Sequence, residues 1–114
     1  MVVACWSSKG GAGTTVVAGV LAVLYARRAS HGALIADLAG DVPPALGLPD
    51  QECPGIADWL AAGSDVPADA LSRLERPACD GLAVLPRGRG DLLPDRGEVL
   101  AALLGTDARP VIAD

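Results

Sequence analysis

A glycine-rich segment lies near the start of the chain, between a short apolar run and a longer apolar stretch. It reads Lys-Gly-Gly-Ala-Gly-Thr-Thr over residues 9–15. Glycine adopts positive φ angles at little steric cost, so this composition allows the backbone to curl tightly. Such a curl points successive N–H groups at one spot, and a helix that begins there adds the positive end of its dipole. The segment therefore predicts a phosphate-binding loop that joins a strand to a helix, which constrains the chain to an α/β fold.

This loop departs from the most common nucleotide-binding pattern. That pattern reads G-x-x-x-x-G-K-[S/T], and its lysine contacts the β- and γ-phosphates of the nucleotide. Here the frame runs from Ser8 to Gly13, and Thr14 stands where the lysine is expected. Lys9 still supplies a positive charge, and Thr15 offers a hydroxyl where a magnesium ligand is needed.

Residues 9–15 resemble the deviant Walker A loop of the ParA/MinD ATPases, which reads K-G-G-x-G-K-[S/T]-T. Lys9 matches the signature lysine of that family and Thr15 matches its magnesium-binding Ser or Thr, whereas Thr14 replaces its second lysine. The replacement resembles the CpaE/TadZ branch, which positions pilus and secretion machinery and in which the loop lysine is often lost. The resemblance implies that ATP and Mg²⁺ are the cofactors.

Later segments are similar to further elements of the family, in the same order. Residues 33–37 resemble its second strand, which usually ends in D-x-D. Asp37 matches the first Asp, but Ala39 occupies the second position, and Asp41 is a candidate replacement two residues further on. The last apolar segment ends in Asp114 and resembles the Walker B strand. Two more segments are similar to family elements, residues 54–60 and 81–86.

Apolar runs and turn signals predict the secondary structure. Strands are expected over residues 2–5, 33–36, 82–85 and 111–113, and helices over residues 14–29, 56–62, 67–74 and 98–104. Because strands alternate with helices, we expect a parallel, doubly wound P-loop NTPase-like sheet with helices on both faces. If the family order holds, the first strand pairs with the last one, and the other two strands lie beyond it.

The length of 114 residues corresponds to one domain or less. We expect the sheet to be truncated after the fourth strand, so that the chain is the N-terminal part of a P-loop NTPase domain. Its expected parts are a P-loop over residues 8–15, a switch-I-like segment over residues 37–41 and a Walker-B-like segment over residues 110–114.

Composition excludes several other classes of protein. The net charge is −5 and no basic cluster exceeds Arg87-Gly88-Arg89, which argues against direct nucleic-acid binding by this segment. We interpret these two arginines as part of a solvated loop. Three widely spaced cysteines and one histidine support neither a disulfide framework nor a metal site of their own. The apolar run 16–26 is shorter than the roughly 20 residues that span a bilayer, and no secretion signal precedes it, so we expect a cytoplasmic protein.

Ligands of doubly wound sheets bind outside the carboxyl ends of the strands, where the glycine loop, residues 37–41 and Asp114 are expected to meet. Thr15, Asp37 and Asp114 are the candidate magnesium ligands, because this ion prefers hard oxygen atoms. Lys9 and Asp41 are the candidate catalytic residues, and the resemblance implies that Lys9 reaches the nucleotide of the partner in a homodimer. The candidate nucleotide-binding residues are Lys9, Gly10, Gly11, Ala12, Gly13, Thr14 and Thr15.

Two functions remain open. The first is an ATP-binding ParA/MinD-like positioning factor with weak or absent hydrolysis, since Thr14 and Ala39 lack the groups that phosphoryl transfer needs. The second is a scaffold that kept the fold and lost the nucleotide. An oxidoreductase with a dinucleotide-binding loop is discounted, because Val16 occupies the last glycine position of G-x-G-x-x-G.

Overall fold

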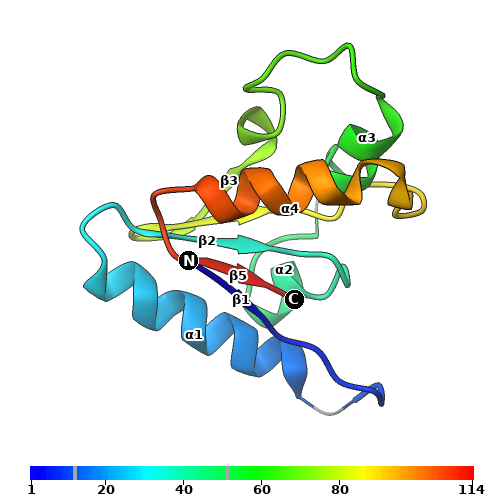
Figure 1. The fold of residues 1–114 in the computed structure, drawn as a ribbon. Coiled ribbons are helices and arrows are strands. Elements are labelled where there is room, and N and C mark those ends of the chain that lie inside the picture. The colour runs from blue at the N-terminus through cyan, green and yellow to red at the C-terminus, as the bar shows by residue number, and fades with distance from the viewer. Residues whose placement is uncertain (12, 51) are drawn as a thin grey trace.

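The computed structural model describes residues 1–11, 13–50 and 52–114. Within this part of the chain, five strands form one sheet in the order β1-β5-β2-β4-β3. The strands are β1 (Val2–Ala4), β2 (Ala33–Ala36), β3 (Arg76–Cys79), β4 (Leu82–Leu85) and β5 (Val111–Ala113). Four of them run parallel, whereas β3 pairs antiparallel with β4 (Figure 1). The predicted α/β class and the predicted order of the four parallel strands are confirmed.

Helices cover both faces of the sheet. The helix α1 (Thr14–Arg28) lies on one face, and α3 (Ile56–Ala61) and α4 (Gly97–Thr106) lie on the other (Figure 1). Three shorter elements complete the described secondary structure: the single-turn helix α2 (Val42–Ala45) and the 3₁₀ turns Ser72–Leu74 and Pro94–Arg96. The described helices include none with the length and apolar character that crossing a bilayer requires.

Alternating side chains of the strands build two separate cores. Successive residues of a strand point to opposite faces of the sheet, so Leu34 and Ile35 of β2 enter different cores. On the α1 side, Ala18 and Ala22 are fully buried, and such small side chains let the helix backbone approach the sheet. On the other side, Trp59 of α3 is 5% exposed and belongs to the second core. The three inner strands, β2, β4 and β5, are therefore largely buried on both faces, as their near-continuous apolar runs predict.

One predicted helix is wrong. The sequence predicts a helix over residues 67–74, but the structure has turns, the short 3₁₀ turn Ser72–Leu74 and then β3. Eight residues with one buried side chain, Leu71, gain too little packing to offset helix nucleation. The strand β3 contains Pro77, which is tolerated because β3 lies at the edge of the sheet and needs no ladder bond on its outer side.

The strand β1 forms the other edge of the sheet. In the described part of the chain β1 pairs only with β5. Val2 is 42% exposed as a consequence. The strand nevertheless ends at the same edge as β5 and β2, so it delivers the glycine loop to the predicted place (Figure 1).

A half-buried ion network lies between the connections that lead into β3 and β5. Arg109 donates to both carboxylate oxygens of Glu75, at 2.8 Å each, and to those of Asp107 at 2.9 and 2.7 Å. The side chains of Arg109 and Glu75 are only 22% and 19% exposed, so water screens this bidentate pair weakly. The Arg109 guanidinium holds the pKa of Asp107 below its ordinary value, and the two carboxylates raise the pKa of Arg109.

Replacing Arg109 with methionine is expected to lower the free energy of unfolding at pH 7 by about 2 kcal/mol, because two half-buried carboxylates lose their partner. The matched control is Arg73→Met, which breaks an ion pair with Asp69 whose side chains are 70% and 55% exposed, and it should cost less than about 0.5 kcal/mol. Urea denaturation measures both values. Equal losses in the two variants would contradict the role given to the network.

The stability difference between the wild-type protein and Arg109→Met should depend on pH. Asp107 has a depressed pKa in the folded state, so its contribution is present above the ordinary Asp value of 3.8 and is lost as the pH falls through the lowered pKa. The wild-type protein should therefore lose more stability on acidification than Arg109→Met.

Candidate nucleotide-binding site

The glycine loop has the backbone conformation that its sequence predicts. Gly11 and Gly13 have φ angles of +75° and +78°, and Gly13 immediately precedes α1. A Cβ atom built on either residue meets nothing within 4 Å, so glycine is needed here for its φ angle and not for space. Ala12 lies outside the described residues. The loop therefore delivers the first turn of α1 to the carboxyl edge of the sheet.

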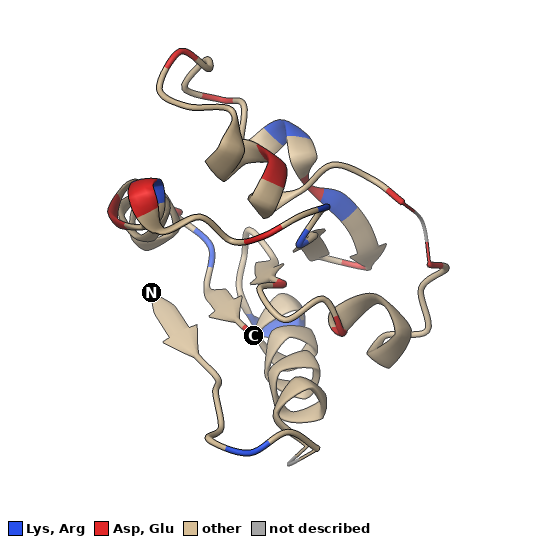
Figure 2. Ribbon diagram, turned by 90° about the vertical axis from the view of Figure 1, so that its right-hand side faces the viewer, with Lys and Arg blue, Asp and Glu red and all other residues tan. Residues whose placement is uncertain are grey.

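A cleft of about 810 Å³ opens between this loop, residues 38–41 and the end of β5. Its lining includes most of the predicted residues: Gly10, Gly11, Gly13, Thr14, Thr15, Asp41 and Asp114, together with Leu38 and Ala39. The first turn of α1 carries no acidic residue, and Arg27 and Arg28 lie in its last turn. The body of α1 is uncharged, whereas acidic and basic residues are interspersed over the loops and the shorter helices (Figure 2). The positive end of the α1 dipole thus faces the cleft.

Thr15 and Asp114 meet at the base of this cleft. The Thr15 Oγ1 hydroxyl donates a hydrogen bond to Asp114 Oδ2 at 2.8 Å, although the two residues are 99 positions apart in the chain. Thr15 belongs to the first turn of α1, and Asp114 directly follows β5. A hydroxyl and a carboxylate oxygen side by side are hard ligands of the kind that Mg²⁺ prefers. The donor set at this point therefore fits a magnesium ion.

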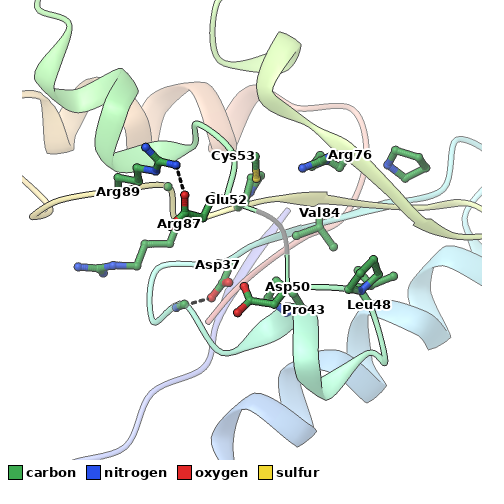
Figure 3. A pocket seen from close by; sticks show the side chains of 15 residues that line it. Asp37, Pro43, Leu48, Asp50, Glu52, Cys53, Arg76, Val84, Arg87 and Arg89 are labelled. Carbon is green, nitrogen blue, oxygen red and sulfur yellow. Dashed lines mark hydrogen bonds and ion pairs between the residues drawn. The ribbon is translucent and has the colours of Figure 1, made fainter.

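Asp37, the third candidate magnesium ligand, is held differently. It is 1% exposed, and its Oδ1 and Oδ2 accept hydrogen bonds from the backbone N–H groups of Gly40, at 2.7 Å, and Val42, at 3.4 Å. Its carboxylate lines a second cavity of about 430 Å³ and not the cleft that contains Thr15 (Figure 3). In the described residues no group of three or more His, Cys, Asp or Glu side chains could hold a metal ion. The structure thus gives Asp37 a role in folding the 38–41 loop.

Burial raises the pKa of Asp37, and the negative charge of Asp114 adds to this effect. A carboxyl group with a raised pKa binds its proton more tightly in the folded state than in the unfolded one. Ionisation of Asp37 therefore lowers the stability of the folded state. This destabilisation is absent below the ordinary pKa of 3.8 and grows as the pH rises through the raised pKa.

Replacing Asp37 with asparagine should consequently leave the protein at least as stable as wild type at pH 7, because the amide oxygen still accepts the bond from Gly40. Stability of the variant should also vary less with pH between about 4 and 7. Asp41→Asn, a change at an exposed carboxylate, is the matched control and should change neither property. Thermal melting across this pH range measures both. A large loss of stability in Asp37→Asn alone would show that the ionised form is required by the fold.

The two candidate catalytic residues are both exposed. Lys9 lies in the glycine loop, where its backbone carbonyl accepts a hydrogen bond from Ser7 Oγ at 2.7 Å, and Asp41 lies at the rim of the cleft. Thr14, at the position of the loop lysine, is half-buried and lines the cleft. Ala39 lines it too, and its side chain offers no group that could position a water molecule.

The interpretation of Arg87 and Arg89 as a solvated loop is right for one of them only. Arg89 is exposed and pairs with the exposed Glu52. Arg87 is half-buried, and its Nη1 donates to the backbone carbonyl of Leu38. Both arginines line the second cavity, together with Asp37 (Figure 3). Sequence reasoning missed this contact, because no local pattern indicates that an arginine reaches a carbonyl 49 residues away.

Comparisons with known proteins place the fold. No family model matches the sequence, and no curated protein sequence matches it. Among solved structures, the chain is similar to a ParA family ATPase from Chlorobium tepidum, with 20% identity and a TM-score of 0.76 over 99% of this chain and 50% of that one. A plasmid partition protein from Borrelia burgdorferi matches with 17% identity and a TM-score of 0.69 over 99% of this chain and 54% of that one.

A third similar structure is a cobyrinic acid a,c-diamide synthase from Mycobacterium smegmatis with a bound ATP analogue and magnesium. It is 23% identical, with a TM-score of 0.62 over 99% of this chain and 50% of that one. The chain thus spans about half the length of these proteins. It has the fold of ParA-like P-loop NTPases.

Proposed function

We propose that the chain is the nucleotide-binding part of a ParA/MinD-like protein, and that it binds Mg-ATP or Mg-ADP in the cleft between the glycine loop and residues 38–41. The single observation that carries the proposal is the Thr15–Asp114 contact beside the glycine loop, at the N-terminus of α1. The ParA-like fold supports it, as does the similar structure that contains an ATP analogue and magnesium.

Each predicted residue has a role in this proposal. Backbone N–H groups of the glycine loop and of the first turn of α1 hold phosphate oxygens, and Lys9 adds a full charge. Thr15 and Asp114 hold Mg²⁺, directly or through water, while Asp37 folds the loop beside it. The bound ion neutralises negative charge on the phosphates.

Turnover is proposed to be slow. Phosphoryl transfer needs charge stabilisation and a positioned water molecule. Thr14 offers a hydroxyl in place of an ammonium group, and Ala39 offers no polar group, which leaves Lys9 and Asp41 as the candidates for catalysis. Binding without rapid hydrolysis fits a switch that positions cellular machinery, as in the CpaE/TadZ branch, with Lys9 acting across a homodimer. We propose that the protein is such a switch and acts in the cytoplasm.

A nucleotide-free scaffold is the second candidate function, and one observation favours it. The Thr15 hydroxyl already has a hydrogen-bond partner in Asp114, so this part of the fold is satisfied without an ion. The substitutions at the lysine and switch positions, Thr14 and Ala39, are in keeping with such a loss.

Calorimetric titration distinguishes the two functions. Mg-ADP and a non-hydrolysable Mg-ATP analogue are expected to bind, and Thr15→Val should weaken binding at least about tenfold with Mg²⁺ but little in its absence. Thr106→Val, at the exposed end of α4, makes the same change far from the cleft and should have no effect. If millimolar nucleotide produced neither heat nor a shift in melting temperature, the scaffold would be the better description.

A further inference from the structure

The 38–41 loop is held at the cleft from three directions. The backbone N–H groups of Leu38 and Ala39 donate to the carbonyl of Asp114, at 2.7 and 3.1 Å. The carboxylate of Asp37 accepts from Gly40 N. The third contact is the guanidinium of Arg87, which donates to the carbonyl of Leu38. The first comes from the residue that follows β5, the second from the residue directly before the loop, and the third from the connection after β4.

That connection is itself fixed to the start of α3. The N–H groups of Ile56 and Ala57 donate to the carbonyls of Pro86 and Arg87, at 2.9 and 2.8 Å. The carboxylate of Asp58 then accepts two more backbone bonds, from Gly55 N at 2.8 Å and from Arg89 N at 3.2 Å. Three of these hydrogen bonds, from Ile56 N, Ala57 N and Arg89 N, attach residues 86–89 to the start of α3, so the backbone that carries the Arg87 side chain is held in place.

The side of the loop that faces Arg87 is not filled by packed side chains. A cavity of about 430 Å³ lies there, with Asp37, Gly40 and Arg87 in its walls (Figure 3). A Cβ atom on Gly40 would come within 3.2 Å of Arg87 Cδ, so the arginine stem also passes directly beside the loop backbone. Without the guanidinium, the loop would have room to move towards this cavity and away from the cleft.

We propose that Arg87 is a positioning residue for the nucleotide cleft: it fixes the 38–41 loop and couples the order of that loop to the N-terminus of α3. The positioning part concerns the chain alone. The coupling part rests on the proposed function, because it requires a nucleotide in the cleft. Coupling of this kind is reciprocal. If an ordered N-terminus of α3 strengthens nucleotide binding through Arg87, bound nucleotide stabilises the N-terminus of α3 by the same free energy.

Hydrogen exchange tests the positioning part without any ligand. Arg87→Met keeps the aliphatic stem and removes the donors. It should speed exchange of the Gly40 amide about tenfold, the change expected for the loss of one charge-assisted hydrogen bond, while the Ile35 amide in the core remains as slow as in wild type. Arg89→Met is the matched control, and Arg87→Lys, which keeps one donor, should restore most of the protection. Unchanged exchange at Gly40 in Arg87→Met would overturn the proposal.

Nucleotide tests the coupling part. Arg87→Met should bind Mg-ADP about tenfold more weakly than wild type, with Arg87→Lys within about threefold of it and Arg89→Met unchanged. Saturating Mg-ADP should slow exchange at the Ile56 and Ala57 amides in wild type but not in Arg87→Met. Equal affinities in wild type and Arg87→Met would overturn the coupling. If wild type bound no nucleotide, the proposed function and the coupling would fail together, and the ligand-free exchange at Gly40 would still decide the positioning role.

Discussion

Replacing Gly88 with alanine is expected to lower the free energy of unfolding by about 3 kcal/mol. Gly88 has a φ angle of +79°, a conformation that costs an L-residue about 1–2 kcal/mol. A Cβ atom at this position would lie 2.2 Å from Asp58 Oδ2 and 2.5 Å from Gly55 N. The backbone atom cannot move without breaking the attachment of residues 86–89 to α3, so strain of about 1–3 kcal/mol adds to the φ cost.

Gly90→Ala separates these two causes. Gly90 has a similar φ angle, +84°, but a Cβ atom there meets nothing within 4 Å. This control should therefore show only the φ cost, about 1–2 kcal/mol. Urea denaturation followed by the fluorescence of the buried Trp59 measures both variants. Equal losses at the two positions would mean that the contact between residues 86–89 and α3 relaxes freely.

The same contact gives stability an acid-sensitive component. Hydrogen bonds from Gly55 N and Arg89 N lower the pKa of Asp58 below its ordinary value of 3.8. Its contribution is present above that ordinary value and is lost as the pH falls through the lowered pKa. The loss of unfolding free energy caused by Gly88→Ala should therefore be smaller in acid, because the contribution of ionised Asp58, which the substitution disturbs, is already absent there.

The four parallel strands and α1 could be predicted because their signals are local. A buried parallel strand reads as a short apolar run, and Ala33–Ala36, Leu82–Leu85 and Val111–Ala113 have the predicted bounds. The glycines of the loop indicate positive φ angles, because glycine adopts them at little steric cost. Carboxyl ends of parallel strands share one edge of the sheet, which is why Thr15 and Asp114 could be expected to meet.

The strand β3 was missed although a signal for it was present. Asp80-Gly81 is a two-residue turn between β3 and β4, and Gly81 has a φ angle of +76°. The residues before this turn are mostly exposed and include Pro77, so neither alternation nor an apolar run marked them as a strand. A helix was predicted instead over residues 67–74, the segment that forms turns directly before β3 in the structure.

The positions of Asp37 and Arg87 lay beyond sequence reasoning for a different reason. Both depend on how irregular loops fold against each other, and such contacts leave no periodic pattern. Asp37 ends its strand as predicted, yet its carboxylate turns to the backbone of Gly40 and Val42, a choice that only the loop conformation decides. Arg87 reaches Leu38 because α3 holds residues 86–89 in place.

Replacing Thr14 with lysine in the glycine loop is expected to strengthen nucleotide binding. Thr14 lies in the first turn of α1, half-buried, in the lining of the cleft. In Thr14→Lys an ammonium group takes the position from which the common loop contacts the β- and γ-phosphates. A charge–phosphate contact of this kind should tighten the binding of Mg-ATP by about tenfold or more.

Hydrolysis should respond to the same substitution. Steady-state phosphate release by the wild-type chain is expected to lie near background, since positioned charges in phosphoryl transfer are worth on the order of 10³-fold or more in rate. Thr14→Lys should raise it, although only partly, because Ala39 still positions no water. Ordinary ATPase turnover in the wild type would instead show that Lys9 or Asp41 compensates.

A control of equal charge makes this result specific. Val20→Lys places the same ammonium group on α1, on a side chain that is 54% exposed and does not line the cleft. Screening by salt over about 10 Å limits what such a distant surface charge can add. Calorimetry should therefore show a gain in affinity for Thr14→Lys and none for Val20→Lys. If both variants bound Mg-ATP as the wild type does, the glycine loop would not be cradling phosphates, and the scaffold function would account better for its retention in the fold.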